Sequence, residues 1–238
     1  MLKAFLDILF PPRCHACKAY IPDADAIHLC APCLEACVLI RSPLCIICGM
    51  PFLTEGGGDH LCGGCITEPP RFTAARAAAV FDGPVRELIH RFKYNNRVQL
   101  CRPLGLLTAQ QLGPFAEATS ADLVIPVPLH LKRLRQRGFN QAVLLGEILA
   151  RQWRLPLSRR NLQRIRWTEP QINLSAAERV ANVRGAFAVS EPALLKGKRI
   201  ILVDDVYTTG STVAECARVL FKADAAEVFV VTVARAES

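Results

Sequence analysis

The pattern of apolar and polar residues changes near residue 70. Before it, cysteine, glycine and proline interrupt the chain, and the apolar residues follow almost no period. After it, short apolar runs alternate with segments whose apolar residues recur every three or four positions. That alternation is typical of an α/β domain with a mostly parallel twisted sheet covered by helices. We therefore expect a small domain over residues 1–70 and an α/β domain over residues 71–238.

The expected strands of the second domain are apolar runs at residues 75–81, 122–127, 186–189, 199–203 and 227–233. The expected helices cover residues 84–94, 103–112, 140–152 and 212–221. A basic turn is expected between the second strand and the third helix. Residues 155–173 are rich in arginine and have no clear period. Ser175 and Glu178 have the spacing of a capping box, so a further helix should begin there.

The first residues, 2–10, are apolar but are interrupted by Asp7 and followed by two prolines, Pro11 and Pro12. This run is too short to span a membrane, and no small-residue cleavage site follows it. A short docking helix is expected, with no membrane insertion. The absence of an export signal predicts a cytoplasmic protein.

Nine of the 11 cysteines precede residue 66, and eight of them form four Cys-x-x-Cys pairs. In a reducing compartment such spacing favours metal over disulfides, and two pairs can place four thiolates around Zn²⁺. Four pairs therefore predict two zinc sites. We expect both to be structural, because a segment with so little hydrophobic core needs metal to fold. Sequential pairing is favoured over a cross-braced arrangement. The expected ligands are Cys14, Cys17, Cys30, Cys33, Cys45, Cys48, Cys62 and Cys65.

The net charge of +8 is unevenly distributed. Residues 1–70 hold four Lys or Arg and seven Asp or Glu, whereas residues 71–238 hold 25 and 14. A basic domain favours an anionic partner, and phosphorylated small molecules, nucleic acid and acidic lipid all qualify.

The segment 200–212 carries the most informative chemistry. An apolar strand ends in two adjacent carboxylates, Asp204 and Asp205, and a turn of small hydroxyl residues around Gly210 follows before a helix begins. Ligands of open α/β sheets bind beyond the carboxyl ends of strands, and a helix N-terminus attracts anions. The turn therefore suits a phosphate, and the carboxylates suit vicinal hydroxyls or a hydroxyl-bound metal ion. A sugar phosphate with a free diol satisfies both.

The stretch 203–212 resembles the phosphoribosyl pyrophosphate motif of type I phosphoribosyltransferases. The whole chain resembles the ComF family, also called GntX-like, including a double zinc ribbon at its N-terminus. Two further stretches share this resemblance: residues 124–128, similar to the strand and loop that hold pyrophosphate, and residues 137–141, typical of ComF proteins.

The resemblance implies a role for each residue of the motif. Asp204 and Asp205 would hold the ribose hydroxyls, and the turn from Thr208 to Thr212 would hold the 5′-phosphate, with Mg²⁺ bound alongside phosphoribosyl pyrophosphate. The basic run that follows the pyrophosphate loop fits independently, because a leaving pyrophosphate needs cations around it; a solvated face or a nucleic-acid contact is the alternative. The expected substrate-binding residues are Val206, Tyr207, Thr208, Thr209, Gly210, Ser211, Thr212, Arg133, Arg135 and Arg137, with Lys93, Lys132, Arg164, Thr168 and Gln171 as weaker candidates.

Two functions stay open on the sequence alone. The first is a phosphoribosyltransferase, a pentosyl-transferring enzyme whose acceptor base or amine the sequence does not identify. The second, implied by the family's link to natural competence, is a non-enzymatic factor that binds single-stranded DNA or competence proteins during DNA uptake. Readers of single-stranded DNA usually interleave aromatic residues with a basic groove, and here the basic region holds only Phe139, Trp153 and Trp167.

Overall fold

The computed structural model describes residues 11–22, 27–53, 56–95, 97–168 and 176–236. The expected helix at residues 2–10, the expected cap Ser175 and the candidate Gln171 lie outside the described residues. The strands are β1 (Ala74–Val80), β2 (Leu123–Pro126), β3 (Leu162–Arg164), β4 (Phe187–Val189), β5 (Arg199–Tyr207) and β6 (Glu227–Arg235). The α-helices are α2 (Ala31–Glu35), α3 (Gly63–Thr67), α4 (Gly83–Tyr94), α5 (Cys101–Gln111), α6 (Gly113–Thr119), α7 (Leu131–Arg137), α8 (Gln141–Trp153), α9 (Ala176–Val183) and α10 (Ser211–Lys222).

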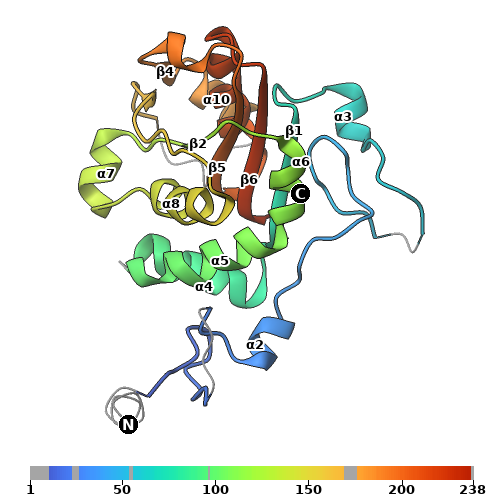
Figure 1. Cartoon of the computed structure of the whole chain (residues 1–238), viewed down its shortest axis with the longest axis vertical. Coiled ribbons are helices and arrows are strands. Elements are labelled where there is room, and N and C mark those ends of the chain that lie inside the picture. Colours follow the sequence, from blue (N-terminus) through green and yellow to red (C-terminus); the bar gives the residue numbers. More distant parts are fainter. Residues whose placement is uncertain (1–10, 23–26, 54–55, 96, 169–175, 237–238) are drawn as a thin grey trace.

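Four strands form a parallel sheet in the order β1-β6-β5-β2, which places β5 and β6 at its centre (Figure 1). The buried runs of these two strands explain their position, since a parallel strand covered on both faces has no solvent side. β3 and β4 pair antiparallel as a separate two-stranded sheet. The predicted α/β class with a mostly parallel sheet is confirmed.

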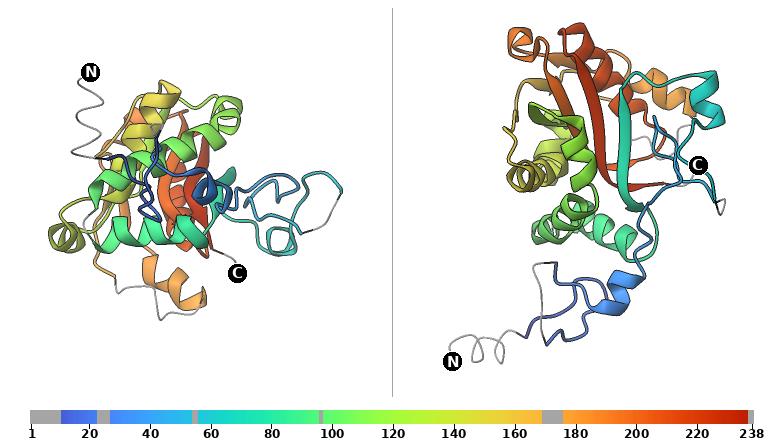
Figure 2. Two further views of the ribbon diagram at one scale, coloured as in Figure 1. Left: turned by 90° about the horizontal axis from the view of Figure 1, so that it is seen from below. Right: turned by 45° about the vertical axis from the view of Figure 1, so that its right-hand side comes forward.

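Successive residues of β5 pack against opposite layers of helices. Ile201 and Val203 join a core formed with α4, α5 and α8, whereas Ile200 and Leu202 join a core formed with α10 and β4. This follows from the period of two in a strand. The molecule therefore has helices on both faces of the sheet, as the views in Figure 2 show.

Three local predictions were wrong. β5 does not end at the carboxylates but continues to Tyr207, because β6 pairs with it as far as Arg235. The expected basic turn contains the short helix α7, which the His130 side chain caps and Gly138 ends in the left-handed conformation. The third concerns residues 155–173, for which no element was expected but which contain β3. A strand of three residues is too short to produce a recognisable apolar period.

The cysteine-rich segments contact two different parts of the α/β domain (Figures 1 and 2). The first lies below α4, where the Arg91 guanidinium donates to the carbonyl oxygens of His15 and Ala16 at 2.9 and 3.3 Å. The second lies beside β1, where the Ala75 N–H donates to the Ile47 carbonyl at 2.6 Å. The predicted boundary near residue 70 falls between α3 and β1. Within the described part of the chain, no helix is both long and apolar enough to cross a membrane.

Candidate functional site

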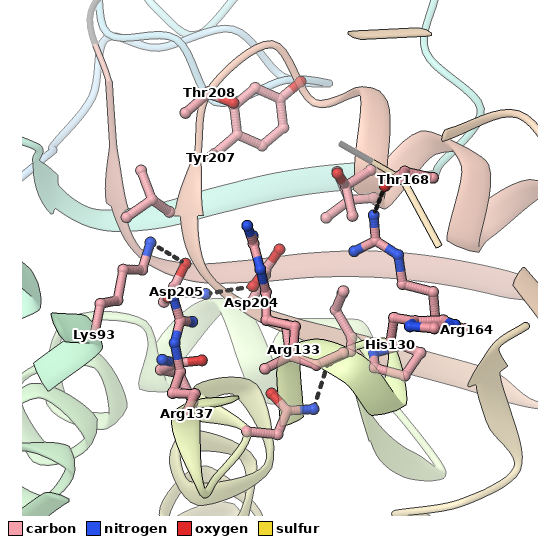
Figure 3. A pocket seen from close by; sticks show the side chains of 18 of the residues that line it. Lys93, His130, Arg133, Arg137, Arg164, Thr168, Asp204, Asp205, Tyr207 and Thr208 are labelled. Carbon is pink, nitrogen blue, oxygen red and sulfur yellow. Dashed lines mark hydrogen bonds and ion pairs between the residues drawn. The ribbon is translucent and has the colours of Figure 1, made fainter. Parts of the chain in front are cut away.

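A cavity of about 550 Å³ lies at the carboxyl edge of the sheet. β5 contributes Asp204 and Asp205, the turn 208–212 leads into α10, and α7 contributes Arg133 and Arg137 from across the cavity (Figure 3). Parallel strands bring their carboxyl ends to one edge, so residues distant in the sequence meet there.

The two carboxylates occupy different environments. Asp205 is 7% exposed, and its Oδ1 lies 2.9 Å from the Lys93 Nζ on α4. Asp204 accepts a hydrogen bond from the Asp205 N–H at 2.9 Å. Burial, together with the neighbouring charge of Asp205, raises the pKa of Asp204 to about 7, although Lys93 lowers it. The pair would therefore gain from a further cation or from hydroxyl donors.

The wall opposite the carboxylates is basic. Five Lys or Arg side chains and two carboxylates line the cavity, so positive charge is in excess. Burial lowers the pKa of Arg137, whose guanidinium lies 5.5 Å from the Tyr94 ring centroid, and Asp205 opposes that shift. Burial likewise lowers the pKa of Arg164, which donates to the Thr168 hydroxyl. An excess of partly buried cations suits a ligand with several phosphate charges.

The turn 208–212 joins the sheet to α10. Gly210 has φ +75° and is the N-cap residue of the 12-residue α10. It packs so closely against the Tyr207 ring that there is no room for a Cβ atom. The first N–H groups of a helix have no partners within the helix and can bind an anion. Thr208, Gly210 and Thr212 line the cavity at this point.

Two buried donors on the cavity wall lack partners. Within the described residues, neither the Gln141 Nε2 nor the Arg164 Nε has a hydrogen-bond partner. Gln141 is 2% exposed and lies at the start of α8. A buried donor without a partner is costly, so these atoms favour a site that a polar ligand completes.

The cysteines form two tetrads, one of residues 14, 17, 30 and 33 and one of residues 45, 48, 62 and 65. In each, the four Sγ atoms lie within 4.8 Å of one another. The Cys17–Cys30 and Cys48–Cys62 Sγ separations are 3.6 and 3.7 Å. A tetrahedral Zn²⁺ with bonds of about 2.3 Å requires sulfur separations of about 3.8 Å. The tetrads are thus sequential rather than cross-braced, and both fit zinc.

Backbone amides favour the thiolate form of the first cysteine in each tetrad. The Cys30 N–H points at the Cys14 Sγ and the Cys62 N–H at the Cys45 Sγ, both at 3.4 Å. Burial alone would raise the pKa of these thiols, but such amide donors lower it to about 6 in both Cys14 and Cys45. A thiolate is the form that binds zinc.

Comparison with known proteins matches this architecture at both ends of the chain. A double zinc ribbon domain matches residues 5–66, and a phosphoribosyl transferase domain matches residues 114–238. Competence protein F of Haemophilus influenzae is 32% identical over 232 residues, which cover 94% of this chain and 97% of that protein. This chain belongs to the ComF family.

Other ComF relatives are similar over most of their length. DNA utilization protein YhgH of Salmonella typhi is 34% identical over 203 residues, 84% of this chain and 87% of that protein. Competence protein ComFC of Bacillus subtilis is 28% identical over 209 residues, 84% of this chain and 80% of that protein. The glutamine phosphoribosylpyrophosphate amidotransferase structure from B. subtilis covers 55% of this chain and 25% of its own, with 26% identity and a TM-score of 0.38, too distant to support an argument.

Most of the site residues expected from the ComF resemblance lie together. Of that set, Asp204, Asp205, Val206, Tyr207, Thr208, Gly210, Thr212, Arg133 and Arg137 line the cavity. Three do not: Arg135 is exposed on another side of α7, and Thr209 and Ser211 line a neighbouring groove, where the Thr209 hydroxyl donates to the Ser211 hydroxyl at 3.1 Å. A seven-residue helix cannot direct three arginines spaced two apart to one face, which explains the place of Arg135.

Five polar residues of the cavity are absent from the set expected from the sequence, and a sixth, Lys93, was only a weak candidate. The five are Tyr94, His130, Asn140, Gln141 and Arg179. The sequence makes Lys93 only a weak candidate, because a single helical lysine is usually solvated. Its position one turn after Ile89 on a buried amphipathic helix was the available signal, because the C-terminal end of α4 reaches the carboxyl edge of the sheet.

Proposed function

We propose that this ComF-family chain binds phosphoribosyl pyrophosphate with Mg²⁺ in the cavity beside Asp204 and Asp205, in the cytoplasm, in a role connected with competence and DNA utilization. Phosphoribosyl transfer is the reaction that such a site would serve. One observation carries the proposal: adjacent carboxylates, a helix N-terminus and an opposing arginine wall converge on one cavity. The match to a phosphoribosyl transferase domain and the names of the relatives support it.

Each part of the cavity would bind one part of this ligand. The turn 208–212 would hold the 5′-phosphate on backbone N–H groups and hydroxyls. Asp204 and Asp205 would accept hydrogen bonds from the ribose hydroxyls. Arg133 and Arg137 would stabilise the charge that develops on a departing pyrophosphate.

The acid pair also fits a divalent cation bound through the ligand, since burial and the charge of Asp205 raise the pKa of Asp204 and a cation would offset both. When bound, Mg²⁺ would neutralise part of the pyrophosphate charge and orient the ribose. Lys93 would offset the negative charge of Asp205 in the absence of ligand, because the two groups are 2.9 Å apart.

The arginines of α7 give a matched test. Arg133→Gln and Arg137→Gln should each weaken phosphoribosyl pyrophosphate binding by about tenfold or more, the usual loss of a charge-assisted hydrogen bond. Arg135→Gln on the same helix should leave affinity unchanged within about twofold. Isothermal titration calorimetry in Mg²⁺ measures all three. An equal loss in all three variants would mean that α7 contributes only a general positive field.

Single-stranded DNA binding is a second candidate, favoured by an aromatic and basic cluster at the cavity rim. Lys132 Nζ lies 4.8 Å and the Arg133 guanidinium carbon 5.9 Å from the Trp167 ring centroid, and the His130 ring is 5.4 Å away. Such a cluster can stack a base and bind its phosphates.

DNA binding and ligand binding can be separated by their sensitivity to substitution. If DNA is bound, anisotropy with labelled oligonucleotides should show affinity that falls steeply between 50 and 200 mM salt, an expectation of order tenfold or more. Trp167→Ala should then weaken DNA binding, and Asp205→Asn should leave it intact. DNA binding that depends on neither salt nor Trp167 would contradict this second candidate.

A further inference from the structure

Arg235, the last residue of β6, lies between the second cysteine tetrad and the site. Its guanidinium donates to the Cys48 carbonyl oxygen at 2.8 Å, with a second nitrogen 3.9 Å from the Cys48 Sγ. On its other side the guanidinium carbon lies 4.4 Å from the Tyr207 ring centroid. Arg235 is only 9% exposed. One side chain therefore contacts both a tetrad cysteine and the residue that precedes the turn 208–212.

Tyr207 connects this contact to the turn. Its ring is 7% exposed, packs edge-on against Phe72 with centroids 6.3 Å apart, and lies so close to the Gly210 Cα that an added methyl group would overlap the ring and its hydroxyl. The ring and the turn can therefore move only together. Figure 3 shows the Tyr207 ring beside Thr208, at a distance from the carboxylates. Tyr207 lines both the cavity and the neighbouring groove.

The positive charge of Arg235 would be balanced by the second tetrad. No carboxylate of the described residues forms a salt bridge with Arg235. A buried cation without a counter-charge is strongly unfavourable. Four thiolates around Zn²⁺ carry a net charge of about −2 and would supply it. Without that negative charge, the Arg235 guanidinium would leave its position on the Tyr207 ring and move into solvent.

We propose that the second tetrad fixes the geometry of the turn 208–212 through Arg235 and Tyr207, so that zinc in this tetrad, and not in the first, sets affinity for an anion at the turn. The ligand is the one given by the proposed function, on which this inference rests. Arg235 is thus a positioning residue that touches no ligand itself.

Among the described residues, no side chain connects the first tetrad to the turn 208–212 in the way that Arg235 connects the second. Arg91 holds its backbone from α4, and the other described partner of that guanidinium is Glu87, one turn earlier on the same helix. α4 is held to the sheet by its own buried face of Val85, Leu88, Ile89 and Phe92. Loss of zinc from the first tetrad should therefore leave the turn in place.

The test compares matched variants of the full zinc-loaded chain. Cys65→Ser removes a ligand of the second tetrad and Cys33→Ser one of the first. Arg235→Gln removes the connection while keeping all eight cysteines, and Arg76→Gln is its control, because Arg76 holds the Ile46 carbonyl of the same tetrad at 3.1 Å without contacting Tyr207. The readouts are zinc content, phosphoribosyl pyrophosphate affinity, and hydrogen exchange of peptides covering residues 207–214 without ligand.

Cys65→Ser and Arg235→Gln should weaken affinity by about fivefold or more, as expected for coupled sites, and should speed exchange of the turn. Cys33→Ser and Arg76→Gln should do neither. Equal effects of the two cysteine variants, or an unchanged turn in Arg235→Gln with both zinc ions bound, would overturn the inference. If the wild-type chain binds no phosphoribosyl pyrophosphate but exchange still separates the two pairs of variants, the proposed function fails and this inference stands.

Discussion

Asp204 and Asp205 are adjacent in the chain, yet their electrostatic environments differ. Lys93 balances Asp205, whereas Asp204 has burial and a like charge against it, which together raise its pKa to about 7. Between the ordinary value of 3.8 and about 7, the folded chain holds a proton on Asp204 that the unfolded chain has released. The contribution of Asp204 to stability therefore falls as the pH rises through that range.

Asp204→Asn should remove this pH dependence while keeping the hydrogen bond that the Asp205 N–H donates. Without ligand, the variant should gain free energy of unfolding over the wild type as the pH rises from 6 to 8, because the wild-type carboxylate becomes ionised. Urea unfolding at both pH values, with zinc held constant, measures the difference. A gap that is the same at pH 6 and pH 8 would show that Asp204 is already ionised at pH 6.

At the scale of elements, apolar periodicity located the long helices and central strands, because burial on one or two faces determines it. The α4 face of Val85, Leu88, Ile89 and Phe92 is an example. The extension of β5 to Tyr207 was missed because Asp204 and Asp205 interrupt the apolar run, and only pairing with β6 shows that the strand continues. α7 and β3 were missed because short elements depend on tertiary contacts rather than on periodicity.

The cavity was predictable in part for the same reason. The carboxylates and the turn are contiguous in the sequence, so their chemistry could be read directly. Lys93 and Tyr94 lie on α4, His130 caps α7 and Arg179 lies on α9, and only the fold brings these elements together. The contact of Arg235 with both Cys48 and Tyr207 had no sequence signal, because the residues are far apart in the chain.

Asn140 joins the loop after β2 to α8. Its side-chain oxygen accepts from the Ala142 N–H at 3.0 Å as the N-cap of α8, and its amide donates to the Val127 carbonyl at 3.0 Å. Asn140→Ala should therefore lose about 1–2 kcal/mol of unfolding free energy. Asn140→Asp keeps the cap and should lose less. Urea denaturation measures both, and equal losses would mean that the cap contributes little.

At the scale of the whole molecule, the two tetrads are attached to different elements by arginines of the α/β domain. Arg91 holds the first from α4, and Arg76 and Arg235 hold the second from the outer strand β1 and from β6. The cysteine-rich segments thus extend the α/β domain at two places, and in the described part of the chain the second contacts Tyr207 through Arg235.

Binding of phosphoribosyl pyrophosphate is the central claim, and ligand-induced thermal stabilisation of the zinc-loaded chain in Mg²⁺ tests it most directly. Ligand at one hundred times its Kd should add about 2.7 kcal/mol and raise the Tm by about 5–10 °C. Asp205→Asn should abolish the rise with little change in the Tm of the free chain, since the site and not the core is altered. No rise in the wild type at millimolar ligand would contradict the claim, and a rise that persists in Asp205→Asn would place the ligand elsewhere.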